Sequence, residues 1–434
     1  MTRDRLSTVA RHGRLRRSHA AFAVLRVLGI GVAVVLVGTV SVAAIAVWRL
    51  SSSITASTVH LQHESGATAP PGVDAISGGV NLLLVGTDTR TGQGGQFANK
   101  ADLAASSGAG NNDVTILLHI AQDHRSAMVV SFPRDLILNL PACPSPKGGS
   151  YSPVTNAMLN SSLARGGLAC PVLTIEKLVP GLTIPYAASI SFDGVAAMSN
   201  AVGGVTVCVA TAIDDPYTGL SLPAGQHTIQ GGVALAFVRT RHGVGDGSDL
   251  GRISNQQVFL SALARKVESE GVLKNPIEVY ALAEAATQNM QLSDTLAHLD
   301  TMASIALALK SVPLENIVMV QYPTGSNPAF PNRVVPVASD AAVNKALVND
   351  AAVTLTGTTG RGSVVDTNPT ADATPTPTPA PTGKNGKPLP TKGKGELLHT
   401  PAATATPVAT TALPSTVTGQ TAAQQTCSKG QKGG

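Results

Sequence analysis

The sequence predicts an α/β (α+β) fold, in which a mixed central β-sheet is flanked by helices and follows one N-terminal transmembrane helix. Short apolar runs that end in glycine or polar residues alternate with segments whose apolar residues recur at helical spacing. Two of these runs, 114–121 and 127–132, are joined by a short turn around Asp123 and His124, which predicts a β-hairpin. Strands and helices interleaved with at least one hairpin indicate a mixed sheet covered by helices.

The remaining elements follow from the same local patterns. An apolar run at 80–85 ends at Gly86 and predicts the first strand. Later strands are expected at 187–192, 205–209 and 317–321. Helical segments are expected near 156–164, 173–178, 194–201, 251–267, 279–290 and 294–310.

The N-terminal region predicts a membrane anchor. Residues 27–48 contain no charged side chain, and at about 1.5 Å of rise per residue a helix of this length crosses the hydrocarbon core of a bilayer. Six arginines lie within the first seventeen residues, ahead of this segment, and Trp48 closes it, so residues 1–26 are expected to be a basic cytoplasmic stub. A cleaved signal peptide is the alternative, but its apolar region would be shorter. Either interpretation places the rest of the chain outside the cytoplasm, in the first case as a single-pass cell membrane protein.

Both flanks of the presumed folded part are rich in small and polar residues. Residues 49–76 are expected to form an extracytoplasmic stalk, and residues 326–365 an extension of uncertain structure. Residues 366–434 are rich in Pro, Thr and Ala and are expected to be disordered, because such a segment buries too little apolar surface to offset its ordering entropy.

The cysteines fit an exported domain. Cys143, Cys170 and Cys208 lie in the presumed folded part, and Cys427 lies in the predicted tail. An exported domain can keep a disulfide, and Cys143 with Cys170 is the preferred pair, although three candidates allow three pairings. A structural zinc site is disfavoured, because the chain has no CxxC or HExxH spacing.

Residues 238–257 concentrate charge in a chain that is only 13% charged. Arg239 and Arg241 point the same way if this segment is extended, and the glycines that follow would let it bend back toward the next helix. Arg252 and Gln256 are one helical turn apart and share a face. Arginines around the start of a helix form a natural anion site.

Two aspartates lie within the same segment. Asp249 is expected to cap the helix that begins near Gly251. In an alternative interpretation, Asp246 and Asp249 form structural salt bridges with the arginines, and the segment then carries no ligand site.

Further charged residues lie where the predicted strands begin or end, which is a common place for a site. Asp88 and Arg90 follow the first strand, Asp113 precedes the second, and Arg134 and Asp135 follow the third. Taken singly, each fits an ordinary turn or cap. Together, the two carboxylates of Asp88 and Asp113 could hold Mg²⁺ (or Mn²⁺), and the arginines could bind a pyrophosphate.

The motifs GTDTR, NNDVTILL, SFPRDL, GGVTVC and RTRHxxxDGSDLGRIxxQQ, in this order, resemble the LytR-CpsA-Psr family of wall-polymer ligases. The resemblance covers residues 78–268 and extends more weakly to 322, which implies a catalytic domain over residues 77–325. The spacing of Cys143, Cys170 and Cys208 is similar to that of actinobacterial members. The resemblance also implies a membrane-anchored, extracytoplasmic protein with an apolar pocket for a polyprenyl lipid.

By this resemblance, the protein is a phosphotransferase that moves a glycopolymer from a polyprenyl-pyrophosphate carrier to peptidoglycan through a phosphodiester bond. Asp88 and Asp113 match metal ligands, and Asp249 matches a carboxylate that orients the neighbouring arginines. The residues that match the pyrophosphate-binding set are Arg90, Arg134, Arg239, Arg241, Arg252 and Gln256. Of these, the catalytic candidates are Arg134, Arg239, Arg241 and Arg252, together with Asp249. Asn255 departs from the family pattern, which commonly has arginine before the glutamine.

Other functions use the same residues. A glycan pyrophosphatase would release the polymer to water, and a non-catalytic anchor would bind anionic wall polymer through its arginines. Nucleic acid is excluded as a partner, because the arginines lie outside the cytoplasm and the basic stub is too short for a folded reader. The general base is not evident from the sequence, with Asp135 and Asp113 as candidates.

Overall fold

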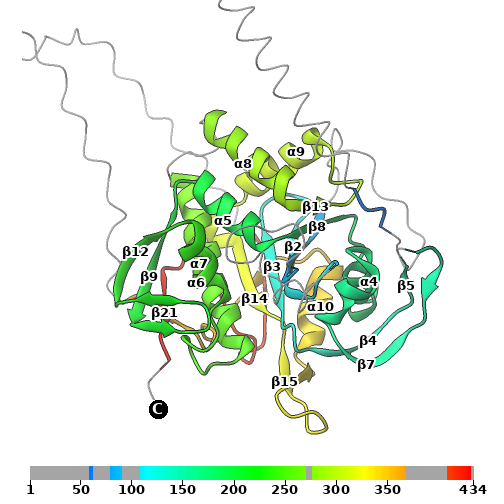
Figure 1. Cartoon of the computed structure of the whole chain (residues 1–434). Helices are drawn as coiled ribbons and strands as arrows, with labels where there is room; N and C mark the ends of the chain where they lie inside the picture. Colours follow the sequence, from blue (N-terminus) through cyan, green and yellow to red (C-terminus); the bar gives the residue numbers. More distant parts are fainter. Residues whose placement is uncertain are drawn as a thin grey trace, which may run out of the picture. The chain divides into compact units, whose positions relative to one another are not determined.

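A seven-stranded mixed sheet lies at the centre of the described part of the chain (Figure 1). Its order is β13-β8-β1-β2-β3-β14-β20, with parallel pairing of β8 with β1 and of β3 with β14 and antiparallel pairing elsewhere. The strands are β1 (Val80–Thr87), β2 (Asn112–Ile120), β3 (Ala127–Phe132), β8 (Tyr186–Ile190), β13 (Met290–Leu292), β14 (Ile317–Gln321) and β20 (Gly419–Thr421).

The computed structural model describes residues 58–61, 79–89, 108–145, 147–269, 276–367 and 408–431. All of them belong to one compact unit, Ser53–Gly434. Within these ranges, no helix combines the length and the apolar character needed to cross a bilayer. The predicted stub at 1–26 and the predicted transmembrane segment at 27–48 lie outside the described residues, as does most of the predicted stalk.

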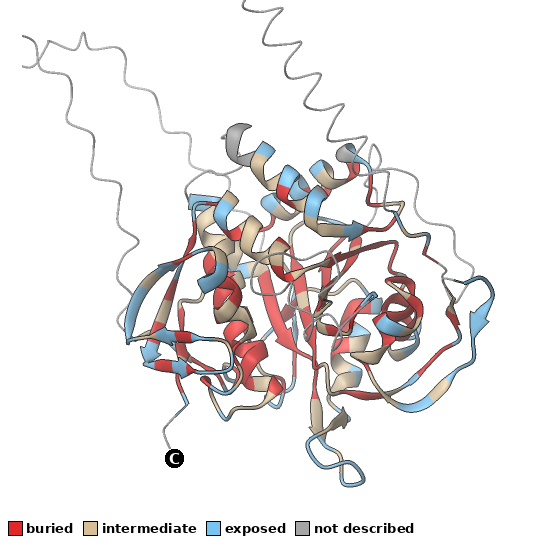
Figure 2. Cartoon of the chain, in the orientation of Figure 1, coloured by how far each residue is buried: buried red, intermediate tan, exposed pale blue. Residues whose placement is uncertain are grey.

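Helices cover both faces of the central sheet. The helices α3 (Ser161–Gly166), α4 (Ala169–Leu178) and α10 (Asp340–Val348) lie on one side and α7 (Asp249–Ser269) lies on the other (Figure 1). The main apolar core fills the first interface, where Leu83, Val130 and Val320 of the sheet pack against Val172 and Val343 of the helices. Figure 2 shows the central strands as largely buried, so the sheet is a rigid support for the loops at its ends.

A second, four-stranded sheet packs against α7. Its order is β12-β9-β21-β18, formed by β12 (Gly225–Ile229), β9 (Val205–Thr211), β21 (Thr426–Lys429) and β18 (Ser363–Val365). Its own apolar core includes Val207, Ile229 and Phe259. Helices α5 (Phe192–Ala201) and α6 (Gly231–Arg239) lie near this second sheet in Figure 1. Helices α8 (Pro276–Asn289) and α9 (Leu299–Ser311) lie at the top of the view, over the end of the central sheet.

Short strands and one 3-10 helix complete the described elements. The paired strands are β4 (Ile137–Leu140) with β7 (Val154–Met158), β5 (Cys143–Pro144) with β6 (Ser150–Tyr151), β10 (Ile213–Asp215) with β11 (Leu220–Leu222), β15 (Thr324–Ser326) with β16 (Val334–Pro336), and β17 (Val353–Thr354) with β19 (Thr411–Ala412). The 3-10 helix η5 (Leu314–Asn316) precedes β14.

Most of the predicted elements are confirmed, including the mixed sheet, the β2–β3 hairpin and the strands at 127–132 and 317–321. The helix predicted from residue 156 is wrong at its start. Residues 154–158 pair with β4 as strand β7, and α3 begins only at Ser161. Asn156 has a positive φ of 54°, which a helix does not allow.

The prediction that residues 366–434 are disordered is wrong for residues 408–431. This segment adds β20 to the edge of the central sheet and inserts β21 between β9 and β18. Ser428 is fully buried there. The extension at 326–365, for which the sequence predicts no definite structure, supplies β16, α10, β17 and β18. Long-range pairing therefore orders polar residues whose local composition indicates disorder.

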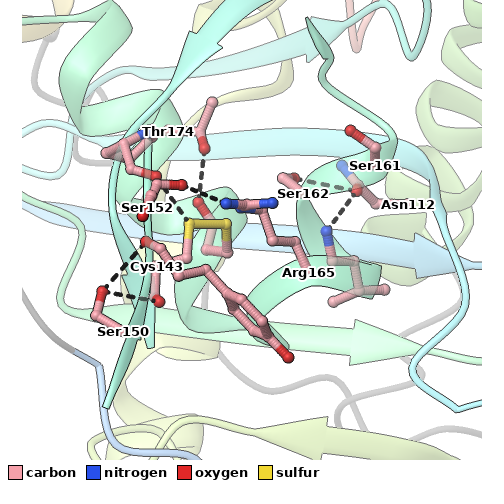
Figure 3. The surroundings of a disulfide bond; sticks show 12 residues. Asn112, Cys143, Ser150, Ser152, Ser161, Ser162, Arg165 and Thr174 are labelled. Atoms are coloured by element: carbon pink, nitrogen blue, oxygen red, sulfur yellow. Dashed lines mark hydrogen bonds between the residues drawn. A yellow bond between two sulfur atoms is a disulfide. The ribbon is translucent and has the colours of Figure 1, made fainter. Parts of the chain in front are cut away.

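Two disulfides tie the fold together. The preferred pair, Cys143 with Cys170, is confirmed and links β5 to α4, beside Arg165, whose guanidinium donates to the Ser152 carbonyl (Figure 3). Cys208 pairs with Cys427, so the cysteine assigned to the predicted tail belongs to the folded unit. No cysteine is free.

Candidate active site

The charged residues predicted at strand boundaries meet at one end of the central sheet. Strand β1 ends and β2 begins at the paired residues Thr87 and Asn112, which places Asp88 and Asp113 at the same end of the sheet. Strand β3 runs antiparallel to β2 and ends at Phe132, so Arg134 and Asp135 follow at the same end. The antiparallel hairpin therefore explains why acids and bases that are distant in sequence converge.

A cavity of about 310 Å³ opens at this end, between the sheet and helices α5, α6 and α7. We call it the arginine cavity, since four arginines line it. Among the described residues, its charged and amide lining consists of Arg134, Arg239, Arg241, Arg252, Gln256, Asp113 and Asp215. Four guanidiniums against two carboxylates leave an excess of positive charge, which favours an anion.

Arg134 and Asp113 form the centre of the arginine cavity. Arg134 Nη1 donates to Asp113 Oδ1 over 2.8 Å, and both side chains are about three-quarters buried. Burial lowers the pKa of Arg134, but the ion pair with Asp113 and the nearby Asp249 and Asp135 outweigh this effect, so the pKa is raised overall. Arg134 therefore stays charged, and its buried Nε has no hydrogen-bond partner.

Asp249 holds Arg252 and Arg134 in place. Its Oδ1 lies 2.7 Å from Arg252 Nη2, and its Oδ2 accepts a hydrogen bond from the backbone N–H of Arg134 over 3.0 Å. Arg252 Nη2 also donates to the backbone carbonyl of Asp113. Asp249 and Arg252 are both buried, so this pair is fixed by its surroundings.

The predicted role of Asp249 as a helix cap is wrong. Helix α7 begins at Asp249 itself, and Ser248 Oγ accepts from the N–H of Gly251 over 3.3 Å. The salt-bridge interpretation holds in part, because Asp249 pairs with Arg252, whereas Asp246 pairs with Arg361 over 2.7 Å. Asp249 is thus free of the capping role and orients guanidiniums.

Arg239 and Arg241 reach the arginine cavity by a route that differs from the predicted extended segment. Arg239 is the last residue of helix α6, and Thr240 leaves the helix in an extended conformation. The guanidinium of Arg239 stacks on the ring of Phe192, 4.1 Å from its centre. Arg241 forms no ion pair with any described residue, and its buried Nε has no hydrogen-bond partner. Arg241 is thus available to an anion.

Asp215 is a site residue that the sequence analysis missed. Its carboxylate is almost fully buried and accepts from Thr240 Oγ1 over 2.5 Å and from the backbone N–H of Arg241 over 3.3 Å. Its other oxygen accepts from the N–H of Tyr217 over 3.0 Å. The motif DDPYTG that contains it looks like an ordinary turn, and only its long-range contacts with residues 240–241 place it at the arginine cavity.

Gln256 and Asn255 point in different directions. Gln256 lines the arginine cavity with Arg252, as predicted, and its Nε2 donates to the Val238 carbonyl over 2.9 Å. Asn255 is fully buried behind them, where it donates to the Phe237 carbonyl and accepts from Ser428 Oγ. Asn255 therefore supports the contact between helix α7 and strand β21 and does not line the arginine cavity.

A second cavity of about 720 Å³ adjoins the first and shares Asp113, Arg134 and Arg241 with it. We call it the acidic cavity. Its described charged lining consists of Asp88, Asp113, Asp135, Asp246, Asp249, Arg134, Arg241, Arg333 and Arg361. Five carboxylates against four guanidiniums reverse the sign of the balance. Two buried polar atoms of its wall, Asn160 Oδ1 and Thr324 Oγ1, have no hydrogen-bond partner.

Asp88 and Asp113 meet the chemical requirement for a divalent cation, since both line the acidic cavity and Mg²⁺ is usually held by one or two carboxylates. Asp88 accepts from the N–H and the Nδ2 of Asn111 over 2.6 and 3.2 Å. A Cβ at Gly110 would lie 2.7 Å from Asp88 Oδ1, so the loop needs glycine there. The residues present therefore fit such an ion.

Arg90 lies outside the described residues, so its predicted position stays a prediction.

In the described part of the chain, the group of three potential metal ligands that lie close together is Cys208, Asp366 and Cys427. Its two sulfurs are joined in a disulfide and do not bind metal.

The fold resembles a solved structure. The crystal structure of protein gbs0355 from Streptococcus agalactiae aligns with a TM-score of 0.51 and 22% identity, over 65% of this chain and 91% of that one. This likeness supports the mixed α+β architecture.

The amino-acid sequence is similar to those of proteins of cell wall biosynthesis. The cell wall biosynthesis protein LcpA of Corynebacterium glutamicum is 29% identical over 58% of this chain, and the match spans about half (51%) of LcpA. The polyisoprenyl-teichoic acid–peptidoglycan teichoic acid transferase TagT of Bacillus subtilis is 28% identical over 58% of this chain and 70% of TagT. The model of the LytR_cpsA_psr family matches residues 47–348, and the chain therefore belongs to that family.

Proposed function

We propose that the protein is a phosphotransferase that moves a glycopolymer from a polyprenyl-pyrophosphate carrier to peptidoglycan through a phosphodiester bond. The observation that carries the proposal is the arginine cavity, in which four guanidiniums outnumber two carboxylates. A diphosphate diester carries a negative charge on each phosphoryl group and matches this excess. The names of relatives support the same class, since TagT is named as a teichoic acid transferase.

The arginine cavity also offers an apolar side to the lipid. Phe192, Val195 and Leu235, from helices α5 and α6, form a small apolar cluster that lines the cavity. The first isoprene units would pack there while the guanidiniums bind the diphosphate. The predicted anchor at 27–48 would hold the domain at the extracytoplasmic surface of the cell membrane, where such a lipid is available.

Asp88 and Asp113 would hold Mg²⁺ or Mn²⁺. The ion would supply positive charge beside the phosphoryl groups. The arginines act in the same sense, because guanidiniums that are already held in place stabilise charge that builds on the departing polyprenyl phosphate. Asp249 contributes by fixing Arg252 and the backbone of Arg134, which reduces the cost of orienting them during the reaction.

The acceptor would enter through the acidic cavity. Its charge balance disfavours a second anion, and the amide and hydroxyl side chains of its wall, among them Asn111, Ser248 and Asn332, suit the hydroxyl and amide groups of a wall glycan. The acceptor oxygen attacks the phosphorus that bears the glycopolymer, and the bond from that phosphorus to the bridging oxygen breaks. The acceptor proton passes to Asp135, and polyprenyl phosphate leaves.

Arg241→Ala tests this proposal, because Arg241 lines both cavities and has no ion-pair partner among the described residues. Transfer from a lipid-linked glycan to peptidoglycan should be lost, while the denaturation midpoint stays that of the wild type. An unchanged transfer rate would contradict the proposal. Release of free polymer phosphate without a wall-linked product would favour hydrolysis, and glycan binding that survives Asp88→Asn without turnover would favour an anchor.

A further inference from the structure

Tyr217 is an anomaly on the described surface. It is 79% exposed, more than any other large apolar or aromatic side chain there, in a chain with only 3% aromatic residues. It lies in the turn between β10 and β11 and lines the arginine cavity with His242. The two ring centroids are 4.5 Å apart with a tilt of 39°.

The backbone beneath this exposed ring is held rigidly. Asp215, only 1% exposed, accepts from the N–H of Tyr217, and its own carbonyl accepts from the N–H of Thr218 over 3.2 Å. The same carboxylate binds Thr240 and the backbone of Arg241. One buried acid therefore fixes the aromatic turn relative to an arginine of the arginine cavity, an arrangement that preorganises a ligand contact.

Resting on the proposed function, we infer that Tyr217, backed by His242, is a platform for the sugar ring that is attached to the pyrophosphate. An aromatic ring offers an apolar face with a polar, solvated tip, and the C–H face of a pyranose packs on such a surface. The alternative occupant is the polyprenyl chain. A lipid on Tyr217 would stay largely in water, whereas the Phe192, Val195 and Leu235 cluster is sheltered. The sugar tolerates solvent, and the lipid does not.

Two probes, one without and one with a sugar, test this inference, and each variant is compared with the wild type for the same probe. They are geranylgeranyl pyrophosphate and the same molecule with N-acetylglucosamine on its terminal phosphate. Calorimetry with the full chain in detergent gives their dissociation constants. Tyr217→Ala should weaken binding of the sugar-bearing probe by about two- to tenfold, the range for an aromatic contact, and leave the bare probe unchanged. Tyr217→Phe should retain wild-type affinity for both probes.

Tyr280→Ala is the matched control, since Tyr280 is also exposed but lies on α8 and lines neither cavity. It should leave both affinities unchanged. Equal weakening of both probes by Tyr217→Ala, or no weakening of either, would overturn the platform while leaving the proposed function standing. If Arg241→Ala binds both probes as tightly as the wild type, the proposed function fails together with the platform.

Discussion

At the scale of single residues, the site depends on buried carboxylates that position arginine residues. Asp249 fixes Arg252 and the backbone of Arg134, and Asp215 fixes the backbone of Arg241. Both acids are buried, so each is paired or hydrogen-bonded, as the cost of burying a charge requires. The guanidinium of Arg252 and the backbones of Arg134 and Arg241 are therefore held in place before a ligand arrives.

Asp135 is a half-buried acid in the wall of the acidic cavity. Burial raises its pKa and the nearby Asp249 adds to the rise, although Arg134, Arg333 and Arg252 oppose it. Because the folded pKa exceeds the unfolded one, the contribution of this group to stability is present below the unfolded pKa and lost as pH rises through the folded pKa. The ionised form thus costs stability at neutral pH, as expected of a group kept for chemistry.

Asp135→Asn should therefore reduce transfer by about 10²–10⁴-fold, the usual range for a general base, without weakening donor binding. The variant should also be at least as stable as the wild type at pH 7, and this advantage should vanish in acid. The rising limb of the wild-type pH–rate profile should disappear. The measurements are transfer rates and denaturation curves across pH, with Asp214→Asn, an exposed aspartate of β10, as the control. A destabilised Asp135→Asn variant at neutral pH would show that Asp135 is structural.

At the scale of elements, strand β21 supports the loop that carries the site arginines. The backbone N–H of Gly245 donates to the Lys429 carbonyl over 2.9 Å, and that of Gln431 donates to the Gly243 carbonyl over 2.9 Å. Ser428 donates to Asn255 in helix α7. The C-terminal strand therefore packs behind residues 243–255 and is part of the scaffold of the site.

Ser428→Ala should destabilise the fold by about 1–3 kcal/mol, because it leaves the buried Asn255 Oδ1 without a donor. A double-mutant cycle with Asn255→Ala isolates the pair, and the coupling energy in urea denaturation should be at least about 0.5 kcal/mol. Ser221→Ala, on the exposed side of β11, is the control. Additive effects of the two substitutions would show that this hydrogen bond does not couple β21 to α7.

The elements also show which features local sequence predicts. Strand β3 and strand β14 are fully predictable, since their runs of Val, Ile, Met and Phe fit a buried strand wherever they lie. Strands β20 and β21 read GQT and TCSK, and nothing local distinguishes them from a disordered tail. Their order comes from partners that are distant in sequence. In the same way, Asp88, Asp113 and Arg134 could be identified as site residues from strand ends, but Asp215 could not.

At the scale of the whole molecule, two disulfides close loops of very different length. Cys143–Cys170 spans 27 residues, and Cys208–Cys427 spans 219. The two loops do not overlap, so each can be opened independently. In the chain-entropy description, the longer loop restricts the unfolded chain more, by roughly 1–2 kcal/mol. The longer loop also attaches β21, the inner strand that joins β9 to β18.

Replacing Cys208 and Cys427 together with serine should therefore cost more stability than replacing Cys143 and Cys170 together, by roughly 1–2 kcal/mol in denaturation under oxidising conditions. Donor affinity should fall as well in the first variant, because a loosened β21 releases the loop at 243–247, and it should persist in the second, whose cysteines do not contact that loop. Equal losses of stability with unchanged donor affinity would mean that β-pairing alone holds the C-terminal strand, and that the disulfide contributes nothing to the position of Arg241.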